Sequence, residues 1–190
     1  MRIISGKNRG RRIVAPDNLP VRPTTDMGKE GLFNILNNYF FFDRVRVLDL
    51  FSGTGNIAYE FASRGAVSVI AVDSDQRCTN FIKKTLGKLQ YDNVAVIRQD
   101  AFAYTAACRQ KFDIIFADPP YEMEGAERVI DNVFGNGLLN PDGWLVMEHP
   151  GTRDFSGHPK FYRHRNYGKV NFSFFANMAD ETGAEGPSDE

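Results

Sequence analysis

Four consecutive residues, Asp118, Pro119, Pro120 and Tyr121, suit chemistry better than packing. They follow Phe112–Ala117, whose composition predicts a buried strand. A carboxylate accepts hydrogen bonds, prolines hold the neighbouring carbonyl groups rigidly, and a tyrosine ring stacks on flat rings. The four residues therefore predict a binding site for a flat substrate that carries nitrogen.

A second group of such residues lies at 49–56, with the sequence Asp-Leu-Phe-Ser-Gly-Thr-Gly-Asn. Gly53 and Gly55 permit a tight turn and let backbone N–H groups approach a ligand closely. The spacing Gly53-x-Gly55-x-x-Ala58 also fits the dinucleotide fingerprint. By itself the motif predicts a nucleotide-binding loop without specifying the nucleotide.

Acidic and aromatic residues after the next two expected strands complete this predicted site. Asp73 follows the expected strand Val67–Val72, where an acid usually holds a ribose diol. Asp100 follows the next strand and could reach a base amino group, while Phe102 covers the ring. The expected cofactor-binding residues are Asp49, Phe51, Ser52, Gly53, Gly55, Asp73, Ser74, Asp100, Ala101 and Phe102.

Two features favour S-adenosylmethionine over a nicotinamide dinucleotide as the cofactor. Asp49 stands just before the glycine loop, where it would hold a cationic amino acid and repel a pyrophosphate. No second arm for a nicotinamide half is apparent, and the C-terminal runs Lys160–Asn166 and Lys169–Phe175 predict a hairpin unlike a doubly wound dehydrogenase. Asp118–Tyr121 would then lie beside a methyl donor.

This arrangement predicts methyl transfer to an exocyclic ring amine. Such an amine is a weak nucleophile because its lone pair is delocalised into the ring. Hydrogen bonds from its N–H groups to the Asp118 carboxylate and the Pro119 carbonyl would favour a pyramidal nitrogen, so positioning and electrostatics would supply most of the rate. Tyr121 would hold a base that has left its stack. The alternative is a turn that merely caps a strand.

Strands and helices alternate along the middle of the chain, which predicts a parallel sheet covered on both faces. We expect an α/β, Rossmann-like class I methyltransferase fold: a seven-stranded mixed sheet with a C-terminal antiparallel hairpin and a small basic N-terminal extension. The expected strands are Val45–Phe51, Val67–Val72, Val94–Arg98, Phe112–Ala117, Trp144–Glu148, Lys160–Asn166 and Lys169–Phe175. The expected helices are Asp26–Tyr39, Ile57–Arg64, Gln76–Leu89, Phe102–Cys108 and Ala126–Gly135.

The composition of the 190 residues is that of one globular domain, with 42% hydrophobic and 25% charged residues. No apolar run is long enough for a transmembrane helix, and the N-terminus does not resemble a signal peptide. Cys78 and Cys108 lack metal-ligand spacing and are expected to be reduced thiols.

The charge is divided unevenly along the chain. Removing the five acids of residues 180–190 from the net charge of −1 leaves +4. We divide the chain into a basic arm at 1–22, a methyltransferase domain at 23–178 and an acidic, disordered tail at 179–190. Two short strands are expected in the arm, Arg2–Ser5 and Arg11–Val14. A basic arm favours a polyanionic partner, the alternative being a solvated arm. The residues expected to bind such a polyanionic substrate, which the family resemblance given below implies is RNA, are Arg2, Lys7, Arg9, Arg11, Arg12, Arg22, Thr24 and Thr25.

The order of these motifs resembles a known family. Asp118-Pro119-Pro120-Tyr121 is the motif of amino-methyltransferases that act on adenine N6 or guanine N2. The head, Arg2-Ile3-Ile4-Ser5-Gly6-Lys7-x-Arg9-Gly10-Arg11 followed by Arg22-Pro23-Thr24-Thr25-Asp26, is similar to that of the bacterial small-subunit (16S) ribosomal RNA guanine-N2 methyltransferases. The similarity covers nearly all of residues 1–176.

The resemblance implies a cytoplasmic, monomeric enzyme that modifies a guanine of ribosomal RNA, as naked RNA or in a small-subunit particle, without metal or membrane. Met27 and Gly28 depart from the family pattern, which puts one RNA or cofactor contact in doubt. The alternatives are a DNA adenine-N6 methyltransferase, a protein glutamine methyltransferase and a non-catalytic RNA-binding assembly factor.

A few other residues admit two interpretations. Thr25 could line the active-site rim or cap the helix that follows. Trp144 is expected to pack rather than to stack on RNA, and His149 is a weak candidate for a catalytic base because no partner is visible. Arg163, His164, Arg165 and Lys169 could extend the basic surface or belong to a solvated edge hairpin.

Overall fold

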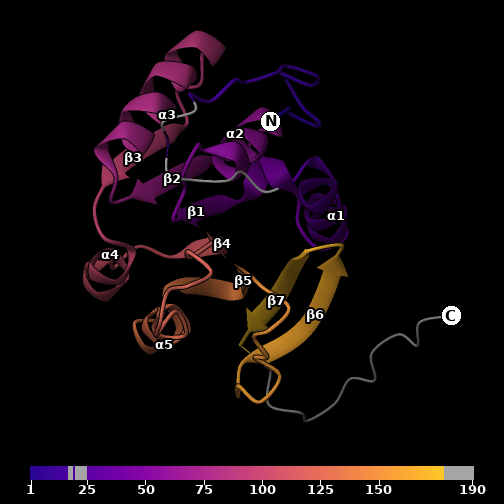
Figure 1. Ribbon diagram of the computed structural model, residues 1–190, viewed down its shortest axis with the longest axis vertical. Coiled ribbons are helices and arrows are strands. Elements are labelled where there is room, and N and C mark those ends of the chain that lie inside the picture. Colours follow the sequence, from indigo (N-terminus) through magenta and orange to yellow (C-terminus); the bar gives the residue numbers. More distant parts are fainter. Residues whose placement is uncertain (17–18, 20–24, 178–190) are drawn as a thin grey trace, which may run out of the picture.

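The computed structural model describes residues 1–16, 19 and 25–177 (Figure 1). Its helices are α1 (Asp26–Asn37), the 3-10 turn η1 (Phe42–Arg44), α2 (Asn56–Ser63), α3 (Gln76–Leu89), α4 (Ala101–Ala107) and α5 (Arg128–Gly135). Its strands are β1 (Arg46–Leu50), β2 (Ser68–Asp73), β3 (Val94–Arg98), β4 (Phe112–Ala117), β5 (Leu139–His149), β6 (Phe161–Tyr167) and β7 (Val170–Ala176).

One seven-stranded sheet organises the fold, with the order β3-β2-β1-β4-β5-β7-β6. Strands β1 to β5 are parallel, whereas β7 runs antiparallel to both β5 and β6. The predicted mixed sheet with a C-terminal hairpin is therefore confirmed, and this is the fold of the class I methyltransferases. The strand order reverses between β1 and β4, and a ligand crevice opens at such a switch point beyond the carboxyl ends of the strands.

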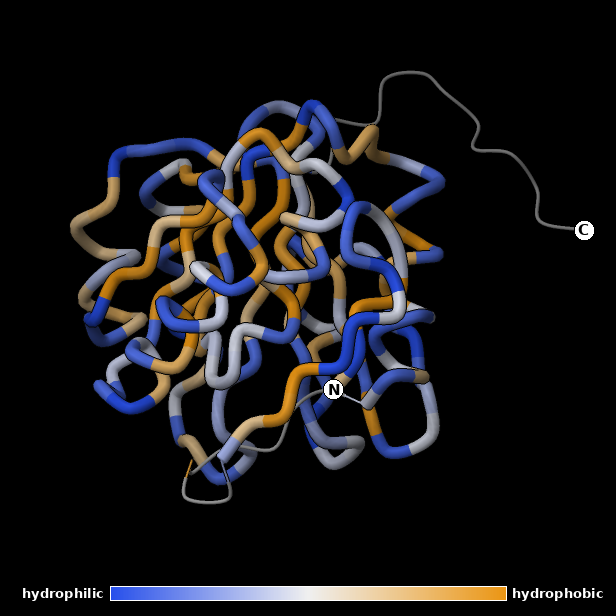
Figure 2. The backbone as a smooth tube through the Cα atoms, turned by 90° about the horizontal axis from the view of Figure 1, so that it is seen from above, coloured by the Kyte–Doolittle hydropathy of each residue, from blue (hydrophilic) through white to orange (hydrophobic). Residues whose placement is uncertain are grey.

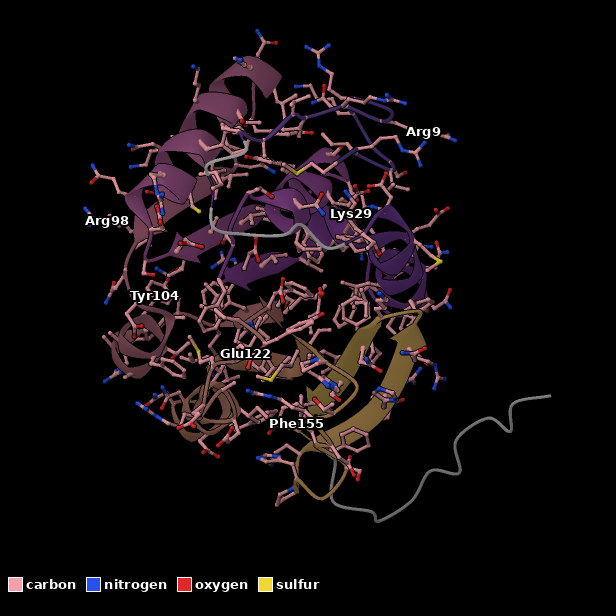
Figure 3. All side chains as sticks on the ribbon, viewed as in Figure 1. Arg9, Lys29, Arg98, Tyr104, Glu122 and Phe155 are labelled. Atoms are coloured by element: carbon pink, nitrogen blue, oxygen red, sulfur yellow. The ribbon has the colours of Figure 1, made fainter. Side chains whose placement is uncertain are left out.

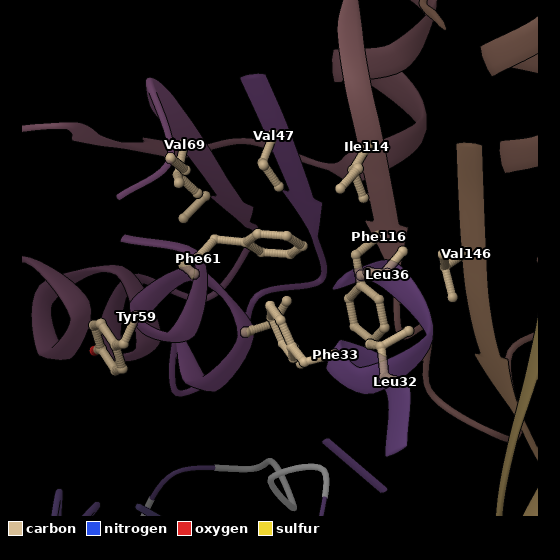
Figure 4. Close-up of a cluster of buried hydrophobic side chains, with 14 of the residues drawn as sticks. Leu32, Phe33, Leu36, Val47, Tyr59, Phe61, Val69, Ile114, Phe116 and Val146 are labelled. Atoms are coloured by element: carbon tan, nitrogen blue, oxygen red, sulfur yellow. The ribbon is translucent and has the colours of Figure 1, made fainter. Parts of the chain in front are cut away.

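Helices cover both faces of the sheet, as Figure 1 shows. Helices α1, α2 and α3 pack on one face, where Phe33, Phe61 and Phe116 belong to the larger core cluster (Figure 4). Helices α4 and α5 pack on the other face over Leu48, Ile115 and their neighbours. The hydropathy trace of Figure 2 shows the apolar segments gathered inside the molecule. Two closely packed apolar layers, one on each face of the sheet, therefore hold the strand ends in place.

Most predicted elements agree with the observed ones within two residues, and α3, β3 and β4 agree at both ends. Strand β5 begins five residues earlier than predicted, through a stretch that contains Pro141 and Gly143. The two predicted N-terminal strands are wrong: in their place one antiparallel bridge joins Arg2 and Arg12. Besides backbone hydrogen bonds between Ile3 and Arg11 and between Ile13 and Met1, the arm donates several of its backbone N–H groups to α2.

Trp144 packs, as expected. It is 7% exposed, and its ring lies 4.5 Å from that of Tyr39 and 5.7 Å from that of Phe174. Arg163 stacks over the same aromatic group, 4.4 Å from the Tyr162 ring centroid, and donates hydrogen bonds to the hydroxyl groups of Tyr39 and Tyr162. This part of the hairpin edge is therefore tied to the end of α1.

Candidate active site

The carboxyl ends of β1 and β4 bring the two predicted motifs together. The strands pair in parallel from Val47 with Ile114 to Leu50 with Ala117, so both chains leave the sheet side by side. The Asp118 amide still lies 3.4 Å from the Leu50 carbonyl oxygen. The glycine loop and the Asp118–Tyr121 segment therefore lie side by side at the carboxyl edge of the sheet, where a ligand crevice is expected.

The glycine loop is held by side chains at its base. Gly53 and Gly55 both have positive φ, at 53° and 78°. The Gly53 amide donates to Asp73 Oδ2 at 2.8 Å, and the Asp75 amide donates to Asp73 Oδ1 at 2.8 Å. Ser52 Oγ lies 2.7 Å from the Asp49 carbonyl oxygen. The loop is thus fixed before any ligand arrives, and Asp73 lies at the tip of β2 as expected.

Asp49 is the least satisfied polar group of the crevice. Its residue is 1% exposed, and its Oδ2 atom has no hydrogen-bond partner within the described residues. Burial raises the pKa of this carboxyl to about 8, and the nearby Asp73 adds to the rise. An ammonium group placed against Oδ2 would satisfy the oxygen and reverse the electrostatic cost. The chemistry of this carboxyl therefore fits the amino-acid end of S-adenosylmethionine.

Aromatic side chains from α4 and from the end of β1 lie beside the expected cofactor site. Asp100 is the N-cap of α4, where its side chain accepts from the Ala103 amide at 2.9 Å. Phe102, in the first turn of α4, lies 6.0 Å from the Phe51 ring in an edge-on arrangement. Ala101 is buried and Ser74 is exposed. The structure thus brings Phe51 and Phe102 together, where a flat base could be covered.

Asp118 lies among other acids. Burial raises the pKa of Asp118 well above its usual value, and Glu148 and Asp49 add to the rise. Tyr121 is 43% exposed, and its hydroxyl lies 3.5 Å from Glu148 Oε1. Burial, with the carboxylates of Glu148 and Asp118, raises the pKa of Tyr121 to about 12. A carboxyl group and a phenol ring thus face one space, with the phenol kept neutral.

Two residues of this region were missed by sequence reasoning. Glu148 is the next-to-last residue of β5 and lies on the sheet face of Asp118, and only the sheet order β4-β5 reveals that the two are neighbours. Arg153 donates from Nη2 to the carbonyl oxygens of Tyr121, at 3.1 Å, and Met123. It holds the loop that carries Tyr121. No local motif marks either residue, so the sequence offered no signal for them.

The basic arm reaches the cofactor loop. Thr54 Oγ1 lies 3.5 Å from the sulfur of Met1, and Arg2 Nε lies 3.7 Å from an Asp26 oxygen. A hollow of about 470 Å³ lies beside Met1, Arg2 and Arg12. The side chains of Lys7, Arg9, Arg11 and Arg12 are exposed, and Figure 3 shows Arg9 pointing outward.

Of the remaining expected RNA-binding residues, one caps a helix and two lie outside the described residues. Thr25 caps α1, since its hydroxyl accepts from the Gly28 amide at 3.1 Å. Arg22 and Thr24 lie outside the described residues. Gly28, one of the two departures from the family pattern, packs closely: a Cβ there would lie 3.4 Å from Val170 of the hairpin.

A buried ion pair fastens the arm to the domain. Lys29 is fully buried, and its Nζ donates to the Arg2 carbonyl oxygen at 2.6 Å and to Asn56 Oδ1 at 2.8 Å. Its partner Glu60, 3.4 Å away, accepts the backbone N–H groups of Ile4 and Ser5. Burial lowers the pKa of Lys29, and Glu60 opposes this effect. Figure 3 shows Lys29 inside the molecule, in contrast to Arg9.

His149 is a core residue. It is 2% exposed, its Nδ1 lies 2.9 Å from the Pro150 carbonyl oxygen, and its Nε2 lies 2.8 Å from Ser173 Oγ. Burial lowers its pKa, so the ring is neutral at pH 7. These contacts explain its position without a catalytic role.

Cys78 and Cys108 are free and buried. Within the described residues no helix has the length and apolar character required to cross a membrane, and no group of three or more His, Cys, Asp or Glu side chains is placed to hold a metal ion.

Comparison with known proteins decides the family. The family model described as "Conserved hypothetical protein 95" matches residues 1–176. The chain belongs to this family. Members of it include the ribosomal RNA small subunit methyltransferase D of Escherichia coli (strain K12), to which the chain is 33% identical over 148 residues, covering 78% of this chain and 71% of that protein. The resemblance to small-subunit ribosomal RNA methyltransferases is therefore confirmed.

Further relatives support the same family. YlbH of Bacillus subtilis (strain 168) is 39% identical over 153 residues, covering 78% of this chain and 82% of YlbH. The solved structure of a hypothetical protein from Thermus thermophilus superimposes with a TM-score of 0.81 at 25% identity, covering 92% of this chain and 98% of that one. That structure therefore shares the fold over most of the chain.

Proposed function

We propose that this protein transfers a methyl group from S-adenosylmethionine to the exocyclic N2 of a guanine in small-subunit ribosomal RNA. One observation carries the proposal: paired strands β1 and β4 place Asp118 close enough to the buried carboxyl of Asp49 for their charges to interact, and Asp49 Oδ2 has no hydrogen-bond partner within the described residues. A site for an amine and a site for a cationic cofactor therefore adjoin. The names of the relatives supply the class of RNA. The partner is ribosomal RNA or the small-subunit particle, in the cytoplasm.

The chain's own residues bind and orient the cofactor. S-adenosylmethionine supplies a methyl group bonded to a positively charged sulfur. Asp49 binds the ammonium group, Asp73 accepts from the ribose hydroxyls, and Phe51 with Phe102 covers the adenine. The cationic ligand stabilises the ionised forms of Asp49 and Asp118, which burial alone disfavours.

Asp118 and Pro119 then orient the amine. Its N–H groups donate to the Asp118 carboxylate and the Pro119 carbonyl oxygen, so the nitrogen lone pair faces the methyl carbon. Bound S-adenosylmethionine would supply the methyl group, with its sulfur keeping the electron pair of the broken C–S bond as the N–C bond forms. The nitrogen would lose one proton to Asp118 or to water. The exposed Tyr121 ring stacks on the base that has left its helix. Positioning and electrostatics supply the rate.

Two measurements test this function. Nucleoside mass spectrometry of ribosomal RNA, from cells with and without the protein, is expected to show loss of one N2-methylguanosine. Asp118→Ala is expected to lower kcat about 100-fold or more, because the amine loses its acceptor, while the Kd for S-adenosylmethionine stays within about threefold of the wild-type value.

The matched control is Glu124→Ala, an exposed acid of the same loop, which is expected to keep full turnover. A fall of N6-methyladenine in DNA, with N2-methylguanosine unchanged, would show that the enzyme is instead an adenine methyltransferase. Full activity of Asp118→Ala would exclude the proposed mechanism.

A further inference from the structure

Glu148 lies beside Asp118 at the carboxyl end of the neighbouring strand. Ala117 of β4 pairs with Met147 of β5, so Asp118 and Glu148 follow one position further along the two strands. Phe116 and Val146, two positions earlier on each strand, lie in the core on the α1–α3 face. Because side chains alternate along strands, both carboxyl groups leave the sheet on that same face.

The contacts of Glu148 point toward the substrate crevice. The residue is 4% exposed, and its Oε1 atom lies 3.5 Å from the Tyr121 hydroxyl. Of the charged groups that raise the pKa of Asp118, Glu148 has the largest effect, and Asp49 acts in the same direction. Two carboxyl groups at the carboxyl ends of adjacent strands form a site that suits the hydrogen-bond donors of a ligand.

Guanine carries the matching donors. On its Watson–Crick edge, the N1–H and the N2 amino group are adjacent donors. Adenine presents its N6 amino group as a donor beside N1, which is an acceptor. Two adjacent carboxylates therefore accept two hydrogen bonds from guanine, whereas with adenine one carboxylate would face a lone pair.

We propose that Glu148 accepts a hydrogen bond from N1–H of the target guanine, beside the N2 amino group held by Asp118, and so selects guanine over adenine. This inference rests on the proposed function and adds to it the residue that reads the base. Tyr121 serves both roles, stacking on the base while its hydroxyl orients the Glu148 carboxylate. A site built to pair a donor rejects an analogue that lacks it strongly, because its own buried group is then left unpaired.

The test compares two bases in one RNA. A fragment of the small-subunit RNA is made with the mapped target nucleotide as guanine or as 2-aminopurine, which keeps the 2-amino group but presents N1 as an acceptor. For the wild-type enzyme, kcat/KM is expected to be about 100-fold or more higher for guanine. In Glu148→Gln the amide can donate to N1, so the preference is expected to fall below about tenfold. The loss of O6 in 2-aminopurine affects both enzymes and cancels in this comparison.

Controls separate base reading from a structural role. Glu127→Gln, an exposed acid at the start of α5, is expected to keep the wild-type preference. Glu148→Asp keeps the charge but retracts it, so its guanine rate is expected to fall while the preference for guanine persists. The thermal unfolding midpoint and the Kd for S-adenosylmethionine are measured for each variant.

The possible outcomes are distinct. If wild-type protein makes N2-methylguanosine and Glu148→Gln slows both bases equally, Glu148 does not read N1 and the inference is wrong, while the proposed function stands. The same conclusion follows if the variant keeps the full preference for guanine. If wild-type protein makes no N2-methylguanosine, both the function and the inference fail.

Discussion

Burial raises the pKa of Asp49 and of Asp118, and both carboxyl groups face the crevice where a cationic cofactor is expected. Such an arrangement destabilises the protein without its cofactor, because ionising either group inside the fold is costly. It favours a positively charged ligand for the same reason.

This cost predicts a pH-dependent stability that Asp49→Asn removes. The folded Asp49 stays protonated up to about pH 8, whereas the unfolded chain ionises it near its usual pKa of 3.8. The unfolded state therefore holds fewer protons between these values, and the free energy of unfolding falls as the pH rises through that window. Without cofactor, Asp49→Asn is expected to stabilise the protein by about 2–4 kcal/mol more at pH 8 than at pH 5.

Urea unfolding at both pH values measures this difference. Asp92→Asn, a change at an exposed acid, is the control and is expected to show no such pH effect. An equal effect of Asp49→Asn at pH 5 and pH 8 would contradict the raised pKa.

At the scale of elements, the close packing of the arm on α2 depends on Gly6. A Cβ at Gly6 would lie 1.8 Å from the Ser63 carbonyl oxygen, a backbone atom that cannot move aside. Gly10 has a nearly equal φ, +79° against +82°, but a Cβ there meets nothing within 4 Å. The two glycines share the same backbone strain and differ only in the clash.

Gly6→Ala is therefore expected to lift the arm, whereas Gly10→Ala is not. The free energy of unfolding should fall by about 1–3 kcal/mol more for Gly6→Ala than for Gly10→Ala. RNA affinity should fall with it, since the arm carries the expected RNA-binding residues. Chemical unfolding and RNA binding of both variants measure the difference. Equal effects of the two substitutions would mean that only the positive φ matters.

The elements were predictable where local chemistry decides them. Helix α3 begins after Asp75, which caps it, and strand β4 is a short apolar run, so both were predicted with correct ends. The arm was not, because several of its backbone N–H groups donate to Glu60 and Ser63, more than fifty residues away. Glu148 was missed for a related reason. It lies beside Asp118 only because β4 and β5 are neighbours in the sheet, and no local sequence pattern encodes the order of the strands.

For the whole molecule, the distribution of charge matters more than the net value of −1. The basic arm begins beside the cofactor loop, with Met1 near Thr54, and then presents the exposed side chains of Lys7, Arg9 and Arg11. A polyanion bound along the arm would therefore pass close to the crevice. Binding of this kind releases counterions and weakens as salt rises.

Replacing Arg9 and Arg11 together by Gln tests this surface. Each lost phosphate contact reduces the slope of log affinity against log salt by about 0.7–0.9, so the pair should reduce it by about 1.4–1.8. The turnover number at saturating RNA and the Kd for S-adenosylmethionine should stay unchanged, because neither residue is expected to contact the cofactor. Lys84 and Lys111, exposed cations on α3 and just before β4, are replaced by Gln as the control with an equal change of charge. If both pairs change the salt slope equally, only the total charge attracts the RNA, and the arm is not its binding surface.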